Sequence, residues 1–314
     1  MIWLVLIVLV VIMSVANPKF FTIANLRTLL TGEAIKGILA FGVAFCILTK
    51  GIELSLGASA ALIACVTGAL VQPVDLATKA LPNLGIQFPA IVSILIGLAI
   101  GVVIGVLQGS LIAYTKMPAF IATLGGQLIC RAAAKIFTTR PVSNLSEGYR
   151  YLGSGTIGPI PVIVLVFILI FIVATFILKQ TRFGKSLYAI GGNDQAARVA
   201  GINVEKNLVL TYIWAGFCAA LAGILLAGRA GSADPANSGL NYELDAIAAA
   251  TVGGTSHTGG ICNPTGVLCG ILILGVINNG LILIGVNDNY TNIIKGLIII
   301  GAVALDMRKN SKRA

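Results

Sequence analysis

The sequence predicts an all-α, polytopic membrane protein with about ten transmembrane helices, some of them interrupted or re-entrant. Of its 314 residues, 57% are hydrophobic and only 10% are charged, and the mean hydropathy is +0.99. A water-soluble globule of this length would need many more charges on its surface. We therefore expect residues 1–314 to form a single transmembrane domain.

The expected spans are runs of apolar residues near the length of about 20 that crosses a bilayer as a helix. They lie near 1–16, 34–50, 54–72, 89–114, 118–138, 161–178, 208–227, 243–254, 264–286 and 291–306. The first run lacks the basic leader and cleavage site of a secretory signal, so we expect it to be retained. Segment 139–160 is rich in Gly, Pro and Ser, which predicts a loop too short to be a domain.

The fourth span carries glycines at every fourth position: Gly97, Gly101, Gly105 and Gly109. This spacing clears one face of a helix, so that a neighbouring backbone can approach closely. The span is expected to be a packing helix. Its groove could alternatively line a solute path.

Two segments look interrupted. Residues 49–57 place Lys50 and Glu53 between two apolar runs, and residues 253–266 carry several polar and helix-breaking residues. Irregular backbone survives in a membrane only where protein or water satisfies it, and solute paths tend to lie at such breaks. The alternative is a pair of surface turns, with Lys50 and Glu53 as a solvated pair.

Basic residues predict the orientation. They gather in segment 179–207 and in the C-terminal tail: Lys179, Arg182, Lys185, Arg198, Lys206, Arg308, Lys309, Lys312 and Arg313. Positive charge favours the cytoplasmic side, and an even number of spans then puts both termini there. Other basic residues, Lys36 among them, fall on the outer side in this topology. The net charge of +10 indicates contact with lipid headgroups, and no basic stripe with interleaved aromatics indicates nucleic-acid binding.

A short polar helix is expected within the loop 179–207. Asn193 can cap it, and Asp194 suits the positive end of its dipole. Flanking glycines would let it lie across the spans. We expect a docking surface made of Gly191, Gly192, Asn193, Asp194, Ala196, Ala197, Arg198 and Gly201. The alternative is an ordinary solvated loop helix.

The sequence offers no catalytic site and no metal site. The only histidine, His257, has no nearby carboxylate, and with Cys262 and Cys269 it fits no zinc spacing. The six cysteines are scattered through apolar stretches as small hydrophobes. Residues 184–186 resemble the end of a phosphate-binding loop but lack its upstream glycine. No cofactor is therefore expected in this chain.

Several motifs in order resemble one family. TRFGKSLYAIGGN (181–193) leads into AARVAGINV (196–204), and ELDAIAAATVGGTS (243–256), VINNGLILIG (276–285) and IIKGLIIIGAVALD (293–306) follow. Upstream are FFTIANL (20–26), ILTKGIELSLGASAAL (47–62) and MPAFIATLG (117–125). The chain is similar in these motifs to the permease subunits of ribose-type monosaccharide ABC importers of the bacterial cytoplasmic (inner) membrane.

The resemblance implies the partners. Two permeases, a second copy or a paralogue, would meet two cytoplasmic subunits that bind ATP, and a sugar-binding protein would deliver solute from outside. The helix in 179–207 would fit a groove in the ATPase. Glu53 stands where the family commonly has Asp, which leaves open which sugar is carried.

Candidate path residues are Glu53, Asn278 and Asn279. Amides within an apolar span can hydrogen-bond solute hydroxyls without carrying charge. Hydrogen bonding between helices is the alternative for each Asn, and Lys295 is expected to reach an interface. The rival function is an ion-coupled secondary transporter or facilitator, although few acids that could relay protons lie in the membrane: Glu53, Glu243 and Asp245.

Overall fold

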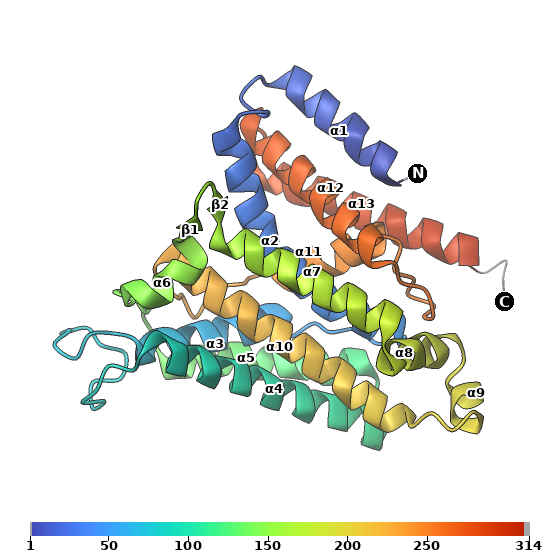
Figure 1. Ribbon diagram of the computed structural model, residues 1–314, viewed down its shortest axis with the longest axis horizontal. Helices are drawn as coiled ribbons and strands as arrows, with labels where there is room; N and C mark the ends of the chain where they lie inside the picture. Colours follow the sequence, from blue (N-terminus) through green and yellow to red (C-terminus); the bar gives the residue numbers. More distant parts are fainter. Residues whose placement is uncertain (1, 311–314) are drawn as a thin grey trace.

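The computed structural model of the chain describes residues 2–310, most of which lie in helices (Figure 1). The first half contains α1 (Ile2–Ala16), α2 (Ile23–Leu48), α3 (Leu56–Leu70), α4 (Ala90–Thr115), α5 (Ala119–Phe137) and α6 (Glu147–Ser154). The second half contains α7 (Val162–Gln180), α8 (Arg182–Gly192), α9 (Asp194–Val199), α10 (Val204–Ala230), α11 (Tyr242–Val252), α12 (Pro264–Leu283) and α13 (Asp288–Asn310). A small antiparallel hairpin of β1 (Thr156–Ile157) and β2 (Ile160–Pro161) follows α6, so the predicted loop 139–160 has some structure of its own.

Among the described residues, six helices are long and apolar enough to cross a membrane: α2, α4, α5, α7, α10 and α12. Helices α1 and α3 are apolar but have only 15 residues each, and α11, expected as the span 243–254, has 11. The structure confirms a helical membrane fold but does not confirm about ten complete crossings. The shortfall lies in α1, α3 and α11, which are too short to cross, and in α13, which has 23 residues but is not among the six.

The chain repeats one order of elements. A long helix, a stretch without regular structure, a short helix and two further helices occur as α2–α5 and again as α10–α13. The packing is reciprocal, since α10 lies against α3 and α4 while α2 lies against α11 and α12, and α2 also contacts α10 (Figure 1). This exchange of equivalent contacts indicates two structurally related halves.

The two interruptions meet in the interior. The first is 49–55, as expected, but the second is 231–241, before α11, rather than the predicted 253–266. A methyl group added to Gly57 would overlap the carbonyl oxygen of Gly239, and one added to Gly239 would overlap Gly57. We call this contact of Gly57 with Gly239 the crossing. Only glycine allows the two backbones to approach so closely, and Gly239 also has a φ of 64°.

The alternative of surface turns fails for the first interruption. Glu53 is 1% exposed, and Lys50 does not pair with it but reaches the carbonyl oxygen of Gly192 at 3.5 Å. The segment 253–263 joins α11 to α12 by turns, and Thr255 within it is fully buried. It is therefore an ordered connection between two helices rather than a second break within a span.

The glycine stripe of α4 packs against α10. Added methyl groups would overlap the backbone of Gly216 at Gly101, of Tyr212 at Gly105 and of Val209 at Gly109. The prediction of a packing helix is thereby confirmed. The groove is filled by the backbone of α10 and leaves no room for a solute there.

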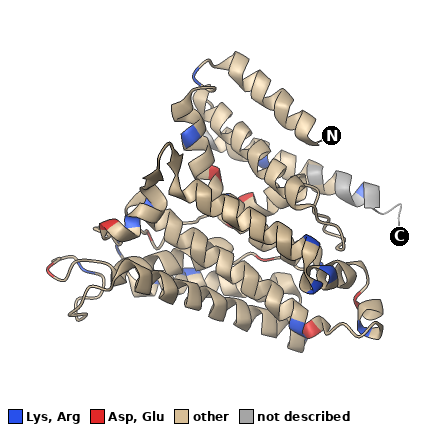
Figure 2. Ribbon diagram, in the orientation of Figure 1, with Lys and Arg blue, Asp and Glu red and all other residues tan. Residues whose placement is uncertain are grey.

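Most positions coloured as charged residues lie toward the two ends of the long helices, and a few lie between them (Figure 2). One end carries α8 and α9, and α1 begins and α13 ends on this side (Figure 1). The opposite end carries α6, the hairpin and the loop that joins α3 to α4 (Figure 1). We refer to these as the α9 end and the α6 end.

Candidate functional site

The loop between α7 and α10 is built from two capped helices. The Thr181 hydroxyl accepts a hydrogen bond from Gly184 N at 3.0 Å at the start of α8. The Asn193 side chain accepts one from Ala196 N at 2.9 Å at the start of α9, which confirms the predicted cap. Gly201 after α9 has a φ of 82°, a conformation that favours glycine. A short helix therefore stands where the sequence places it.

The eight predicted docking residues do not all face outward. Gly191 is buried against Leu48 and Gly260, and Ala197 is buried with Ile190 and Val204. The other six are exposed: Gly192, Asn193, Asp194, Ala196, Arg198 and Gly201. Val199, which the sequence reasoning missed, is 91% exposed. An apolar residue on a polar helix was the signal that could have found it.

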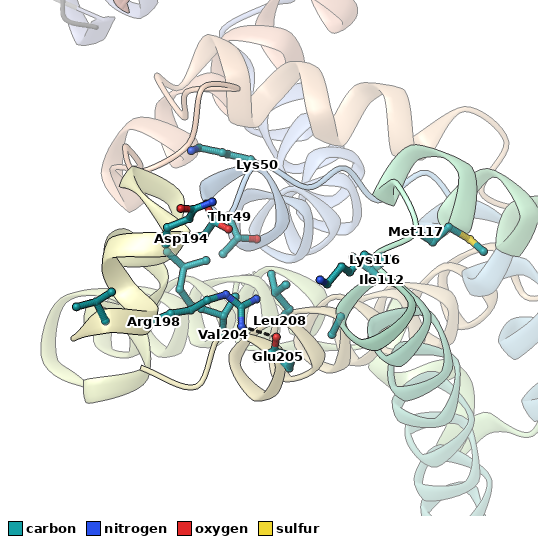
Figure 3. Close-up of a pocket in the computed structure, with 14 residues that line it drawn as sticks. Thr49, Lys50, Ile112, Lys116, Met117, Asp194, Arg198, Val204, Glu205 and Leu208 are labelled. Atoms are coloured by element: carbon teal, nitrogen blue, oxygen red, sulfur yellow. Dashed lines mark hydrogen bonds and ion pairs between the residues drawn. The ribbon is translucent and has the colours of Figure 1, made fainter. Parts of the chain in front are cut away.

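A cleft of about 860 Å³ opens beside α9, and we call it the α9 cleft (Figure 3). Basic residues from three elements line it, namely Lys50, Lys116 and Arg198, and Arg198 forms an ion pair with Glu205. Apolar side chains such as Val199 complete the wall. The cleft therefore combines three basic and two acidic side chains, the acids being Asp194 and Glu205, with apolar surface next to the exposed face of α9.

At the α9 end, Tyr188 of α8 holds two segments together. Its hydroxyl donates to the carbonyl oxygen of Cys262 at 2.7 Å and so ties α8 to the connection between α11 and α12. Burial raises the pKa of the Tyr188 phenol well above its usual range. The phenol consequently remains a donor throughout the physiological pH range.

The first interruption is held by hydrogen bonds and contains no ion pair of the described residues. Glu53 Oε1 accepts from the backbone N–H of Ser55 at 2.7 Å, so its carboxylate lies just before the start of α3. Gln108 of α4 donates to Ser55 Oγ at 2.8 Å, and Ser59 donates to Cys130 Sγ at 3.5 Å. Glu53 is thus part of a buried polar cluster, and its proposed contact with solute remains a prediction.

A second carboxylate lies at the start of α11. Glu243 is 3% exposed, and its Oε1 accepts from Gln127 Nε2 of α5 at 3.1 Å. One turn further along α5, Arg131 donates to the carbonyl oxygens of Pro235, Ala236 and Ser238 at 2.9 to 3.2 Å. Gln127 therefore fastens the start of α11 to α5, and Arg131 fastens the second interruption to it. Polar residues four apart in a span were the sequence signal for them.

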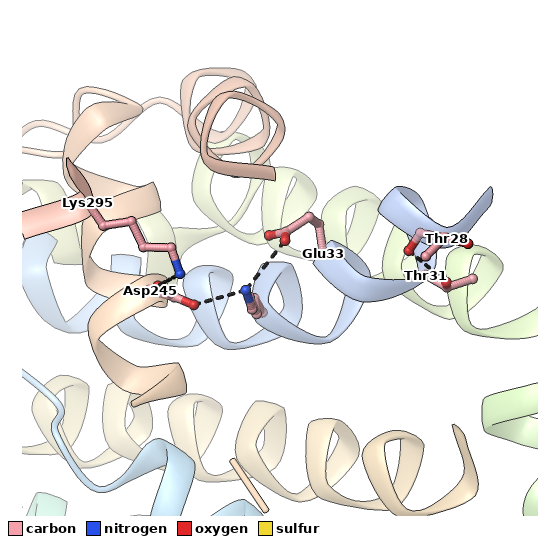
Figure 4. A network of polar contacts seen from close by, with 6 residues as sticks. Thr28, Thr31, Glu33, Asp245 and Lys295 are labelled. Carbon is pink, nitrogen blue, oxygen red and sulfur yellow. Dashed lines mark hydrogen bonds and ion pairs between the residues drawn. The ribbon is translucent and has the colours of Figure 1, made fainter. Parts of the chain in front are cut away.

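Four charged residues connect α2, α11 and α13, and we call them the charge network (Figure 4). Lys36 Nζ lies 2.9 Å from Asp245 Oδ2 and 3.4 Å from Glu33 Oε1, and Lys295 Nζ lies 3.3 Å from Asp245 Oδ1. Lys36, predicted on the outer side, therefore lies within the candidate span α2, and Lys295 reaches an acid rather than an interface. The four charges sum to zero.

Asn278 and Asn279 are not brought together with Glu53. Asn279 exchanges two hydrogen bonds with Asn25 of α2, at 2.8 and 2.9 Å. This is the interhelical bonding that was the alternative for it. Asn278 is half-buried beside it on α12. A role of either amide in a solute path stays a prediction.

The six cysteines are buried and free, as their apolar surroundings predict. Within residues 2–310, no group of three or more His, Cys, Asp and Glu side chains is arranged to hold a metal ion. His257 Nε2 lies 2.8 Å from the Thr251 hydroxyl, at the end of α11.

Comparison with known proteins identifies the family to which this chain belongs. Residues 25–303 match the family described as "Branched-chain amino acid transport system / permease component". The ribose import permease protein RbsC of Bacillus subtilis (strain 168) is 42% identical over 98% of this chain and 92% of its own length. The galactose/methyl galactoside import permease protein MglC of Escherichia coli (strain K12) is 41% identical over 99% and 95%, and RbsC of that strain is 38% identical over 97% and 92%. No solved structure matches the chain.

Proposed function

Because the chain belongs to the family of permease components that residues 25–303 match, we propose that it is the membrane-spanning permease subunit of an ATP-driven importer of a monosaccharide. The observation that carries this proposal is the identity of about 40% to permeases named for ribose and for galactose, over almost the whole of both chains. The family description names branched-chain amino acids, but the full-length relatives are sugar permeases. We therefore assign a ribose-like pentose, a hexose or a related sugar.

The protein is a multi-pass membrane protein, and we assign it to a bacterial inner membrane with the α9 end in the cytoplasm. Support comes from the basic residues of α8 and α9 and from the relatives. Because α1 begins and α13 ends on that side, both termini lie in the cytoplasm in this orientation (Figure 1).

The cytoplasmic ATP-binding subunit docks on α9 and the α9 cleft in this proposal. Val199, 91% exposed, supplies the apolar anchor, and Arg198 and Lys116 supply positive charge beside it. ATP is bound by that partner, and the chain needs no cofactor of its own. Gly191 and Ala197 are buried, so they stabilise the fold of the loop and do not contact the ATPase subunit in this proposal.

The docking proposal predicts the effect of Val199→Asp. A charge at this exposed position should reduce co-purification of the ATPase subunit, because an apolar contact would have to bury an unpaired carboxylate. Ile157→Asp, at an exposed site in the hairpin of the α6 end, is the matched control and should leave co-purification unchanged. Equal yields of ATPase from both variants would place the docking surface elsewhere.

The solute enters from an extracytoplasmic sugar-binding protein and passes between this chain and a second permease, a copy or a paralogue. Helix α5 is the best candidate for the wall of the path, because it packs mainly on α3 and α4 and leaves its other side free. Gln127 and Arg131 give this span a polar edge beside α11.

Reconstitution tests the function. In proteoliposomes that contain the permease, its ATPase subunit and its binding protein, uptake of radiolabelled D-ribose or D-galactose should require ATP and should stop with a non-hydrolysable analogue. The rival is an ion-coupled transporter. Concentrative uptake by this chain alone, driven by a proton or sodium gradient, would overturn the importer assignment.

A further inference from the structure

We propose that the start of α3 and the carboxylate of Glu243 form a binding site for one hydroxyl group of an uncharged polyol. This inference rests on the proposed function and adds to it the part of the permease that recognises the solute. It joins two elements that lie far apart in the sequence and meet at the crossing.

Glu243 offers an acceptor that nothing in the described chain satisfies. Its Oε1 is held by Gln127, but its Oε2 is shut off from solvent and accepts no hydrogen bond from the described residues. Leaving a buried carboxyl oxygen without a hydrogen-bond partner is costly, and buried polar atoms in proteins nearly always have one. The site therefore calls for a donor from outside the chain.

Helix α3 offers donors at the same place. A methyl group added to Gly57 would overlap Glu243 Oε2, so this oxygen lies against the first turn of α3. The first α-helical bond there runs from Ser59 N to Ser55 O at 2.7 Å, and the Ser55 side chain does not cap the helix. The N–H groups of Leu56, Gly57 and Ala58 are the donors that a helix start leaves without an intrahelical partner.

A hydroxyl group is the chemistry that fits both sides. Its oxygen can accept from an N–H group of α3 while its hydrogen is donated to Glu243 Oε2. An anion would be repelled by the carboxylate. A cation would meet the positive end of the 15-residue helix α3 and the guanidinium of Arg131 beside the same segment. A neutral group that donates and accepts at once faces neither penalty.

The site is closed in this structure, because Gly57 and Gly239 touch and leave no room for a solute atom between them. Separation of α3 from α11 opens it and uncovers both the donors and the acceptor. Polyol binding and opening of the crossing are therefore coupled.

Infrared difference spectra of the full chain, purified with its ATPase subunit in lipid nanodiscs, test the site. Spectra are recorded without nucleotide and with a non-hydrolysable ATP analogue, with glycerol as the polyol probe. We expect glycerol to shift a carboxylate band in at least one state and Glu243→Gln to abolish the shift. Glu147→Gln, at an exposed position of α6, should retain it, and 1,2-dimethoxyethane, which has no hydroxyl donor, should cause none.

Three results would overturn the proposal: no shift in either state, a shift that persists in Glu243→Gln, or an equal shift with dimethoxyethane, which would mean that the shift needs no hydroxyl donor. Sugar uptake gives a second readout. Since a hydrogen bond to a charged group is lost, Glu243→Gln should lower the uptake rate about 10-fold to 100-fold, with unchanged affinity of the binding protein for sugar. Wild-type complex that imports neither D-ribose nor D-galactose would count against the proposed function alone, because the glycerol experiment still decides this site.

Discussion

Helices α3 and α11 occupy equivalent places in the two halves of the molecule and are held by different chemistry. Each follows an interruption, each is too short to span a bilayer, and each begins at the crossing. Around α3, most fastenings are hydroxyl, amide and thiol groups, as in the bonds of Gln108 to Ser55 and of Ser59 to Cys130. The Glu53 carboxylate there accepts from the backbone N–H of Ser55 and pairs with no cation among the described residues. No ion pair of the described residues involves α3.

Helix α11 is fastened by charge. Asp245 receives Lys36 from α2 and Lys295 from α13, and Glu33 balances Lys36 from one turn before it. A neutral hydroxyl in a membrane readily finds another partner, so its loss costs little. A buried charge that loses its partner is left uncompensated, which costs several times more. The half that contains α3 should therefore tolerate the loss of one polar partner, and the half that contains α11 should not. The variants below test that difference.

The largest effect is expected for Lys36→Met. The change leaves Glu33 and Asp245 with one cation between them, so it should lower the free energy of unfolding by about 3–5 kcal/mol. Thermal melting of the purified permease in one detergent measures this. Lys19→Met, at an exposed position before α2, is the control and should melt as wild type does.

A double variant separates charge from packing. Lys36→Met with Glu33→Gln removes one charge of each sign and leaves the neutral pair of Lys295 with Asp245. It should recover a large part of the stability lost in the single variant. A double variant as unstable as Lys36→Met alone would contradict the view that α11 is fastened by charge balance.

The next effect concerns the crossing, which both half-helices share. Gly57→Ala should lower stability by about 1–3 kcal/mol, because its methyl group must displace Gly239 or the Glu243 side chain. Gly125→Ala is the matched control, since a methyl group there meets open space. Melting temperatures of the two variants compare them directly, and equal melting would show that the half-helices are not in tight contact.

A smaller effect is expected for the neutral side. Gln108→Leu removes the donor to Ser55 and should cost about 1 kcal/mol, in the range of measured interhelical hydrogen bonds in membranes. Gln180→Leu, at an exposed position at the end of α7, serves as the control. A loss as large as that of Lys36→Met would remove the distinction between the two halves.

Sequence reasoning reached the features that depend on neighbouring residues. The cap at Asn193 and the glycine stripe of α4 follow from local spacing, and both appear in the structure. The resemblance likewise led to the family that the comparisons identify. The apolar run predicts a span that begins near 34, whereas α2 begins at Ile23, because an apolar run marks the hydrophobic part of a helix and not its cap. Thr22 accepts from Asn25 N and was the available signal.

The features that depend on contacts between distant segments were not predictable. No local sequence pattern predicts that Lys36 contacts Asp245 or that Gly57 contacts Gly239. Both contacts form only when the two halves of the chain pack together. The second interruption was a different kind of miss. Segment 231–241 contains Gly231, Pro235 and Gly239, which are ordinary signals of a break, but the stretch 253–266 is more polar and gives the stronger signal. The order of elements repeats between the two halves, but the amino-acid sequence shows no clear repeat that would predict it.

The smallest effect is expected for the ion pair that lies outside this buried arrangement, and it sets the scale for the others. Arg198 of α9 pairs with Glu205 of α10, with the two side chains 43% and 28% exposed. Water and salt screen such a pair, so Arg198→Gln should change the free energy of unfolding by at most about 1 kcal/mol, and added salt should reduce the difference further. Lys36→Met melted in parallel should stay far less stable than wild type at every salt concentration, because its unpaired carboxylates lie where ions do not reach. If salt removed the two differences alike, the charge network would have to be solvated, and α11 would be held as loosely as α3.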